Sequence, residues 1–289
     1  SASAPRGAPS EHDRQIAQAS AAARLAYERG DYAQARELYR RALTRAQAID
    51  SARLAADAAY NLAICEIALR DYAAADARLR QAEYDAARAA APLIDIRLLR
   101  AKVAYLDARP SDADALAGDV MASGPPAVLR LQAVLLRGTL RSDAGDIAAA
   151  RAELQAASAL AHANDKALTP SLRADLEKLR GTIARLDGDA ESAARAFEAE
   201  VTSLRSAKRH RDMGYALARA GEAHLSAGRA ALAADRYFLA ARSLGRQGEG
   251  TAARGFADAS LAAALQANDA AAGARARRLL EELTARDGP

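Results

Sequence analysis

The feature that most constrains the fold of this sequence is a two-residue turn signal that returns about every 40 residues. The turns are Gly30-Asp31, Arg70-Asp71, Gly145-Asp146, Gly188-Asp189, Gly228-Arg229 and Asn268-Asp269. A small residue lies five positions after the start of each turn: Ala35, Ala75, Ala150, Ala193, Ala233 and Gly273. Another usually lies seven positions before it: Ala23, Ala63, Gly138, Gly181 and Gly221, with Leu261 as the exception. Small residues on both sides of a short turn let two helices cross closely, and a period of this length is typical of solenoids.

A seventh, weaker copy fits the long gap in this series, with Ala101, a turn near Ala108-Arg109-Pro110, and Ala113. Between the turns, apolar residues recur with the helical period. Ala and Leu dominate the composition, only 4% of the residues are aromatic and there is no Trp, which favours helices over strands. We therefore expect an all-α fold, a right-handed superhelical solenoid of about seven helical hairpins.

The start of the chain differs from the rest, because it is rich in Ser, Ala and Pro and has no apolar periodicity. We expect residues 1–14 to form a flexible N-terminal tether and residues 15–286 to form the helical-repeat domain. The stretch Ser10-Glu11-His12-Asp13 has the spacing of a capping box, which predicts a helix start nearby. A small, polar, Pro-bearing leader resembles the segment after the cleavage site of a bacterial secreted protein or lipoprotein, and an artificial chain end explains it equally well. The first explanation predicts a periplasmic location, with an outer-membrane tether if a lipidated Cys lies upstream of Ser1; a cytoplasmic location is the alternative.

The charges are numerous but balanced, with 41 basic and 37 acidic side chains and a net charge of +4. They are interspersed along the chain, as on a solvated helical surface, so we expect no nucleic-acid partner. The densest basic run, Lys208-Arg209-His210-Arg211, lies in a connection between repeats. No apolar run approaches the ~18 residues that cross a bilayer.

Residues that carry chemistry are sparse. The four His residues are scattered, and none has metal-ligand spacing with another His or with the single cysteine, Cys65. Cys65 lies among apolar helical residues and is expected to be a buried structural thiol. His224 is expected to lie at a helix end or on the surface. No phosphate-binding loop and no nucleophile–base set can be placed, so the sequence predicts no catalysis, no metal and no cofactor.

These repeats resemble the tetratricopeptide-repeat (TPR) family. The best match is the first unit, with Ala23, Gly30-Asp31-Tyr32, Ala35, Tyr39 and Ala42-Leu43, followed by the second, with Ala63, Asp71-Tyr72, Ala75, Leu79 and Ala82. Units four to six add large residues that come after their small ones: Leu154, Phe197 and Tyr237. The resemblance covers nearly everything from about residue 15 to residue 286. The units run near 40 rather than 34 residues and lack the aromatic that often opens a repeat and the Pro that often closes one, which implies longer helices.

The resemblance implies that partners bind on a concave surface lined by the first helix of each repeat. One subset of the family grips a C-terminal carboxylate with grouped Lys, Arg and Asn residues. On the aligned face, Arg24, Asn61, Lys102, Lys178 and Arg185 are spread between unit one and unit five rather than grouped, so we do not expect such a clamp.

The aligned face carries a mostly apolar stripe in units two to five. Its candidate ligand-binding residues are Tyr60, Asn61, Ile64, Ile67, Leu98, Leu99, Lys102, Tyr105, Leu135, Leu136 and Leu179. Three interpretations are open: packing between the longer helices, binding of a protein segment such as an amphipathic helix, or binding of an apolar small molecule such as a lipid or sterol-like compound. Our leading hypothesis is a non-catalytic scaffold or adaptor that holds a protein partner at the bacterial cell envelope. The alternative is a carrier of an apolar ligand within an envelope lipid transport system.

Overall fold

A computed structural model describes residues 11–286 of the chain. The first helix begins at Glu11, so residues 11–14, which the sequence analysis assigned to the tether, belong to the helical array instead. The capping-box spacing at residues 10–13 was the better guide to this helix start. The rest of the predicted tether lies outside the described residues.

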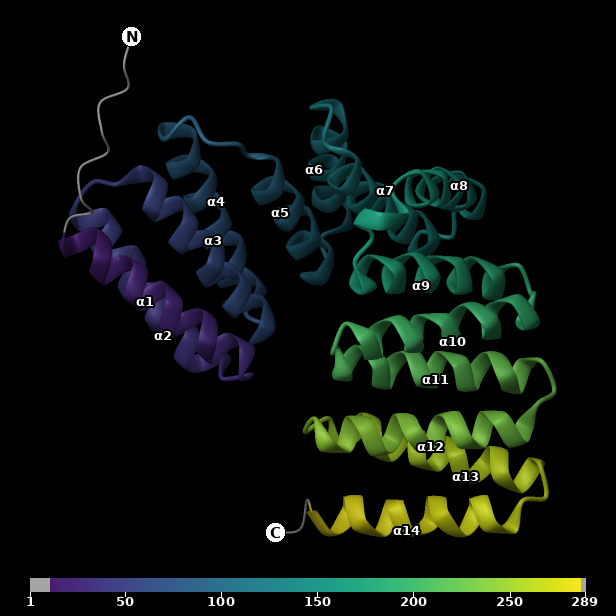
Figure 1. Cartoon of the computed structure of the whole chain (residues 1–289). Helices are drawn as coiled ribbons and strands as arrows, with labels where there is room; N and C mark the ends of the chain where they lie inside the picture. The colour runs from purple at the N-terminus through teal and green to yellow at the C-terminus, as the bar shows by residue number, and fades with distance from the viewer. Residues whose placement is uncertain (1–10, 287–289) are drawn as a thin grey trace. The chain divides into compact units, whose positions relative to one another are not determined.

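The described chain consists of fourteen α-helices that pair into seven hairpins (Figure 1). The first three hairpins are α1 (Glu11–Glu28) with α2 (Tyr32–Ala48), α3 (Ala52–Ala68) with α4 (Tyr72–Arg88), and α5 (Ile94–Leu106) with α6 (Pro110–Ala122). The others are α7 (Ala127–Asp143) with α8 (Ile147–Ala163), α9 (Pro170–Leu186) with α10 (Ala190–Ser206), α11 (His210–Ser226) with α12 (Ala230–Arg246), and α13 (Gly250–Gln266) with α14 (Ala270–Arg286). A short 3₁₀ turn, Asp165–Ala167, precedes α9. Most helices have 17 residues, which explains the long repeat, and α5 and α6 have only 13.

Every hairpin turn contains one residue with a left-handed backbone. These residues are Gly30, Arg70, Ala108, Gly145, Gly188, Gly228 and Asn268, with φ between 55° and 82°. The Asp that comes after most of them caps the next helix; for example, Oδ1 of Asp31 accepts a hydrogen bond from the backbone N–H of Gln34 at 3.0 Å. Together these features end one helix and start the next within three residues. The predicted turns and hairpins are therefore confirmed.

The small residues beside the turns lie where the two helices of a hairpin cross. Ala35, Ala75, Ala150, Ala193 and Ala233 are all fully buried. Gly181 of α9 shows why no larger side chain fits: a Cβ placed there would lie 2.6 Å from Cε1 of Phe197 on α10. The predicted close crossings are thus confirmed by burial and by contact.

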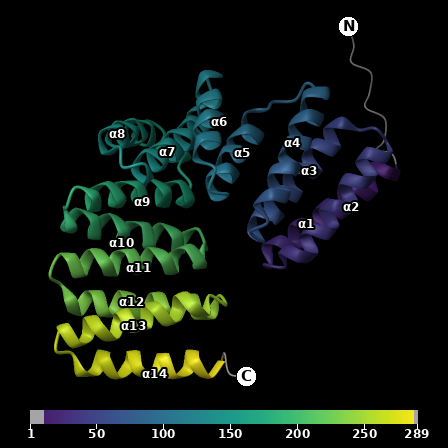
Figure 2. The ribbon, with the colours of Figure 1, turned by 180° about the vertical axis from the view of Figure 1, so that it is seen from behind.

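The helices group into two compact units, residues 1–133 and residues 134–289, with the boundary inside α7. In the second unit, α9 to α14 lie in successive layers in which each helix packs on the next, as both views show (Figures 1 and 2). In the first unit, α1 to α4 form the same kind of stack, and α5 packs on α4 and α6. The all-α solenoid of helical hairpins is confirmed, whereas its right-handed superhelical course stays a prediction.

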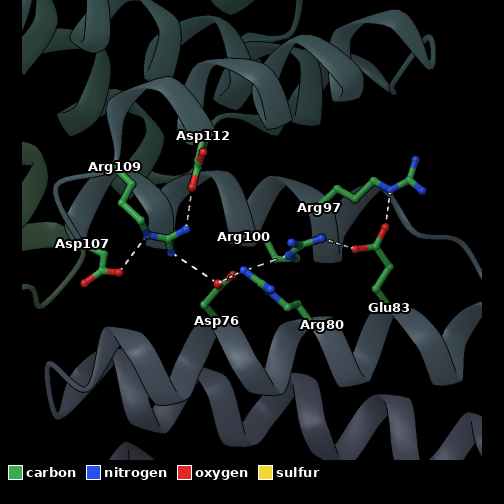
Figure 3. Close-up of polar contacts among 8 residues, drawn as sticks. All are labelled: Asp76, Arg80, Glu83, Arg97, Arg100, Asp107, Arg109 and Asp112. Atoms are coloured by element: carbon green, nitrogen blue, oxygen red, sulfur yellow. Dashed lines mark hydrogen bonds and ion pairs between the residues drawn. The ribbon is translucent and has the colours of Figure 1, made fainter.

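The short third hairpin is joined to α4 by ion pairs (Figure 3). Asp76 of α4 is buried, with 7% of its surface exposed. Its carboxylate lies 2.9 Å from a guanidinium nitrogen of Arg80, 3.6 Å from Arg100 and 3.4 Å from Arg109. Arg109 in turn pairs with Asp112 at 2.9 Å. One buried carboxylate therefore connects α4 to α5 and to the start of α6.

A second carboxylate strengthens the contact between α4 and α5. Glu83 accepts hydrogen bonds from Arg97 at 2.6 Å and from Arg100 (Figure 3). Burial acts to raise the pKa of Glu83, but the hydrogen bonds from the two arginines outweigh it and lower the pKa below its usual value. Polar pairing thus contributes to the contact between α4 and the shortest hairpin.

Candidate binding groove

Four of the predicted groove residues are core residues. The exposed fractions of Leu98, Leu135, Leu136 and Leu179 are 2%, 5%, 8% and 2%. Leu179 of α9 fills the space that Gly138 leaves on α7, since a Cβ at Gly138 would lie 2.6 Å from Cδ2 of Leu179. The prediction that these four side chains line an open groove is wrong, because packing against neighbouring helices buries them.

Leu98 illustrates how this packing arises. It forms a buried cluster with Val120 of α6 and Ala133 of α7. A first helix in an array packs on the helices before and after it, so two apolar faces are needed for packing alone. Apolar character at a position of the first helix is therefore insufficient to predict an open surface.

The candidate residues on α3 are different, because all four are half-buried: Tyr60, Asn61, Ile64 and Ile67. The opposite face of α3 carries the fully buried Leu62 and Ala63, together with Glu66. Tyr60 and Ile67 rest against the core of the first unit on one side and reach solvent on the other. Asn61 Nδ2 donates to the backbone carbonyl of Asp57 at 2.8 Å. The α3 residues are thus held in place yet accessible.

Three candidate residues on α5 are also half-buried: Leu99, Lys102 and Tyr105. Leu99 packs on the same core cluster as Tyr60 and Ile67. Nζ of Lys102 donates to Oε1 of Gln132 at 2.6 Å, which places its charge at the α7 side of α5. We call this set the α3–α5 face: Tyr60, Asn61, Ile64, Ile67, Leu99, Lys102 and Tyr105.

A pocket of about 620 Å³ opens beside the α3–α5 face. It lies between α3, the α4–α5 connection and the start of α5; Tyr60, Asp57, Arg53, Asp95 and Ile96 contribute to its lining, together with small residues of the connection. Burial, and secondarily the charge of Asp95, raises the pKa of the Tyr60 hydroxyl. This hydroxyl therefore stays protonated and can donate a hydrogen bond at neutral pH.

In the second unit, several other first-helix positions of the aligned face are polar. On α9, Lys178 and Arg185 are exposed. On α11, Arg219 pairs with Glu200, a carboxylate only 2% exposed. Burial raises the pKa of Glu200 even with Arg219 beside it. Of the eleven predicted residues, the seven that stay accessible are therefore those of the α3–α5 face.

The basic run at residues 208–211 is largely neutralised. Arg209 pairs with Asp212 at 2.8 Å and with Asp175 at 3.3 Å, and Arg211 pairs with Glu249 at 2.6 Å. Charges that are paired within the fold are not available to phosphates. The run thus serves the contact between hairpins, in keeping with its place in a connection.

His224 lies in the last turn of α11 but is buried, with 7% of its surface exposed. Its Nε2 lies 2.9 Å from Oε1 of Glu198, a carboxylate that also accepts a 2.6 Å hydrogen bond from Arg236. Of the two expected positions, a helix end or the surface, the structure shows the helix end. The sequence hides this pair because its members lie 26 residues apart on different helices.

The other reactive groups have structural surroundings. Cys65 is fully buried, and burial raises the pKa of its thiol to about 11, so it is an inert thiol at neutral pH, as predicted. Among the described residues, no group of three His, Cys, Asp or Glu side chains is placed to hold a metal ion. No described helix is both long and apolar enough to span a bilayer.

One further surface was missed by the sequence analysis: a basic cleft between α12 and α14. Its signal is present in the sequence, because Arg242 and Arg246 lie four residues apart, and Arg275 and Arg278 lie three apart, so each pair shares one helix face. What the sequence does not reveal is that the two faces meet.

Comparison with known proteins gives no match by sequence, either to a protein-family model or to a curated protein. Solved structures do match. A Rap protein in complex with competence and sporulation factor superposes with a TM-score of 0.64 at 12% identity, covering 94% of this chain and 75% of the other. PilW, a type IV pilus biogenesis factor, gives 0.54 at 17% identity over 77% and 90% of the two chains. A tetratricopeptide repeat protein from Parabacteroides merdae gives 0.51 at 13% identity over 94% and 99%. At such identities the likeness concerns the fold, and this chain shares the helical-hairpin fold of tetratricopeptide-repeat proteins.

Proposed function

We propose that this chain is a non-catalytic binding protein, an adaptor that holds a segment of a partner protein on the α3–α5 face. The observation that carries the proposal is that four apolar or aromatic side chains of first helices are half-buried and accessible: Tyr60, Ile64, Ile67 and Leu99. Tyr60, Ile67 and Leu99 also pack against the core. Rigid apolar side chains with polar neighbours are typical of interaction sites. The Rap structure with competence and sporulation factor is an example of this fold holding another molecule.

The occupant that fits this face is an amphipathic helix. The α3 residues Tyr60, Ile64 and Ile67 have the i, i+4, i+7 spacing, which produces one ridge about 10 Å long. A partner helix that lays its own apolar ridge beside this one would bury both. Asn61 and Lys102 at the edge would contact the polar flank of the partner.

The test compares two double variants of the full chain. Ile64→Ser with Ile67→Ser removes two side chains of the α3–α5 face, whereas Leu232→Ser with Leu265→Ser removes two apolar side chains that are 44% and 61% exposed on other helices. Proteins retained from an envelope extract are identified by mass spectrometry, and melting curves are recorded in parallel. We expect a defined protein to be retained by the wild type and the control pair and lost with the Ile64/Ile67 pair. Equal retention by both pairs would contradict the proposal.

A second candidate function is the carriage of an apolar small molecule, and the pocket beside Tyr60 favours it. Its volume of about 620 Å³ falls within the range of small-ligand sites. Ala89→Leu would narrow this pocket without touching Ile64 or Ile67, since Ala89 lines the pocket with an ordinary φ of −84°. Co-purified lipid that is lost in Ala89→Leu but kept in the Ile64/Ile67 pair would identify a carrier; the reverse pattern for a protein ligand would identify an adaptor.

We also propose a location at the bacterial cell envelope, in the periplasm. The support is the structural likeness to PilW, a pilus biogenesis factor. A lipidated Cys upstream of Ser1 would add a tether to the outer membrane, and a cytoplasmic location is the alternative. Fractionation of the source cells tests this: recovery with periplasmic or membrane markers is expected, and recovery with cytosolic markers alone would contradict it.

A further inference from the structure

The second unit carries a basic cleft whose chemistry differs from that of the α3–α5 face. The cleft, of about 370 Å³, lies between the second helices of the last two hairpins, α12 and α14. Four arginines line it, Arg242, Arg246, Arg275 and Arg278, with Glu282 as the only acidic residue of the lining. All four arginines are at least partly exposed. We call it the α12–α14 cleft.

The arginines of the cleft are unlike those between other second helices. Arg236 of α12 pairs with Glu198 of α10 at 2.6 Å, and Arg229 pairs with Glu191 at 2.8 Å. Among the described residues, none of the four cleft arginines has a carboxylate partner; the contact recorded for Arg278 runs to a backbone carbonyl of its own helix. Arginines at the contact between α10 and α12 are therefore paired with carboxylates. The four arginines at the contact between α12 and α14 have no such partner among the described residues.

An aromatic ring holds two of these guanidinium groups. Arg242 lies 5.7 Å and Arg275 lies 5.5 Å from the centroid of the Phe238 ring. A guanidinium over a ring uses its face for the ring and keeps its N–H edges for acceptors. Such edges bind a carboxylate through two parallel hydrogen bonds. The ring thus orders two positive charges without neutralising them.

The floor of the cleft is apolar. Leu279 and Leu283 of α14 are buried beneath it. Gly245 of α12 lets the helices approach there, since a Cβ at this position would lie 2.8 Å from Cδ2 of Leu283. The lining residues extend over about eight positions on each helix, which corresponds to about 12 Å. That length matches about four residues of extended chain.

We propose that the α12–α14 cleft binds an acidic segment of a partner protein, with carboxylates on the arginines and an apolar side chain against Phe238. Charge complementarity identifies the occupant as anionic, and the apolar floor favours a chain that also carries an apolar side chain. A single-stranded nucleic acid would require several successive aromatic platforms, whereas one ring lines this cleft. The proposal is independent of the α3–α5 face, so the two can fail separately.

The test measures fluorescence anisotropy of a labelled peptide of about eight residues in which Glu alternates with Leu, mixed with the full chain. Arg275→Ala with Arg278→Ala removes two charges from the cleft. Arg205→Ala with Arg277→Ala removes two exposed charges outside it and is the matched control. We expect the cleft pair to weaken binding about tenfold or more and the control pair to change it less than about twofold, because charge-assisted hydrogen bonds are lost only in the first. Phe238→Leu, which keeps the net charge, is expected to weaken binding severalfold.

Three results would overturn the proposal. Equal weakening by the two arginine pairs would reduce the effect to net charge. Equal affinity for a peptide with Gln in place of Glu would remove carboxylate recognition. Displacement of the labelled peptide by phosphatidylglycerol vesicles or by a thymidine oligonucleotide, at lower concentrations than the unlabelled Glu–Leu peptide requires, would assign the cleft to a membrane or to nucleic acid.

Discussion

Replacing Gly181 with Ala is expected to destabilise the second unit, although Ala is the better helix former. The added methyl group would lie 2.6 Å from Cε1, 2.7 Å from Cδ1 and 3.0 Å from Cζ of Phe197. Phe197 is fully buried, so its ring cannot swing into solvent, and α9 and α10 have to separate. Gly255 on α13 is the matched control, because a Cβ there meets no atom within 4 Å.

The two substitutions are expected to have opposite signs. Ala in place of Gly inside a helix gains up to about 1 kcal/mol, and this gain applies at both sites. Overpacking of a buried crossing costs about 1–3 kcal/mol and applies only at Gly181. Gly255→Ala should therefore raise the free energy of unfolding by up to about 1 kcal/mol, whereas Gly181→Ala should lower it by up to about 2 kcal/mol.

The assay is urea unfolding followed by helical circular dichroism, with the midpoints of both variants compared with that of the wild type. A double variant that adds Phe197→Leu to Gly181→Ala gives the ring more room and should recover part of the loss, as expected for side chains in contact. Equal midpoints for Gly181→Ala and Gly255→Ala would refute the reasoning, because the close crossing would then carry no energetic weight.

Three further predictions concern the first unit. Asp76→Ala is expected to lower the free energy of unfolding by about 1–3 kcal/mol, because it removes a buried acceptor shared by α4, α5 and α6. Asp112→Ala, at an exposed pair, should change it by less than about 1 kcal/mol. Urea unfolding compares the two variants, and equal losses would contradict the ion-pair network around Asp76. Cys65 is expected to react with a thiol reagent slowly in the native state and rapidly in denaturant, measured by absorbance, and rapid native reaction would contradict its burial. Because the folded pKa of Glu83 is lowered, its stabilisation is complete above the unfolded value of 4.5 and is lost as the pH falls through the folded value; Glu83→Gln should flatten this acid loss in pH-dependent melting, and an unchanged pH profile would contradict it.

The fold was predictable because each repeat contains local sequence signals for its turn and its helix crossing. A left-handed residue marks each hairpin turn, and in most turns a capping Asp follows it, as at Gly30-Asp31 and Gly188-Asp189. A small residue on each side fixes the crossing, as Gly181 does with Phe197. These signals act within one hairpin, so a single sequence contains them. The third turn has no capping Asp, but Ala108 still takes the left-handed conformation and Pro110 begins the next helix.

The binding surface was less predictable because burial depends on contacts between hairpins. Leu98 and Leu99 are neighbours in sequence, yet the first is a core residue and the second is half-buried. Leu136 and Leu179 occupy the same place in the repeat as Leu99, two positions before the small residue, but are buried by packing against adjacent helices. Likewise, the arginines of α12 and α14 lie far apart in the sequence, and only the packing of α12 against α14 brings them together.

The proposed function requires the α3–α5 face to be an open binding surface. The most direct measurement is photocrosslinking in the source cells, with a benzophenone amino acid placed at Ile64 in one strain and at Lys178, on the polar first-helix face of α9, in another. We predict a discrete protein adduct from position 64 and none from position 178, since both side chains reach solvent but only the first lies on the apolar face. Absence of any adduct at position 64, or the same adducts at both positions, would contradict the claim.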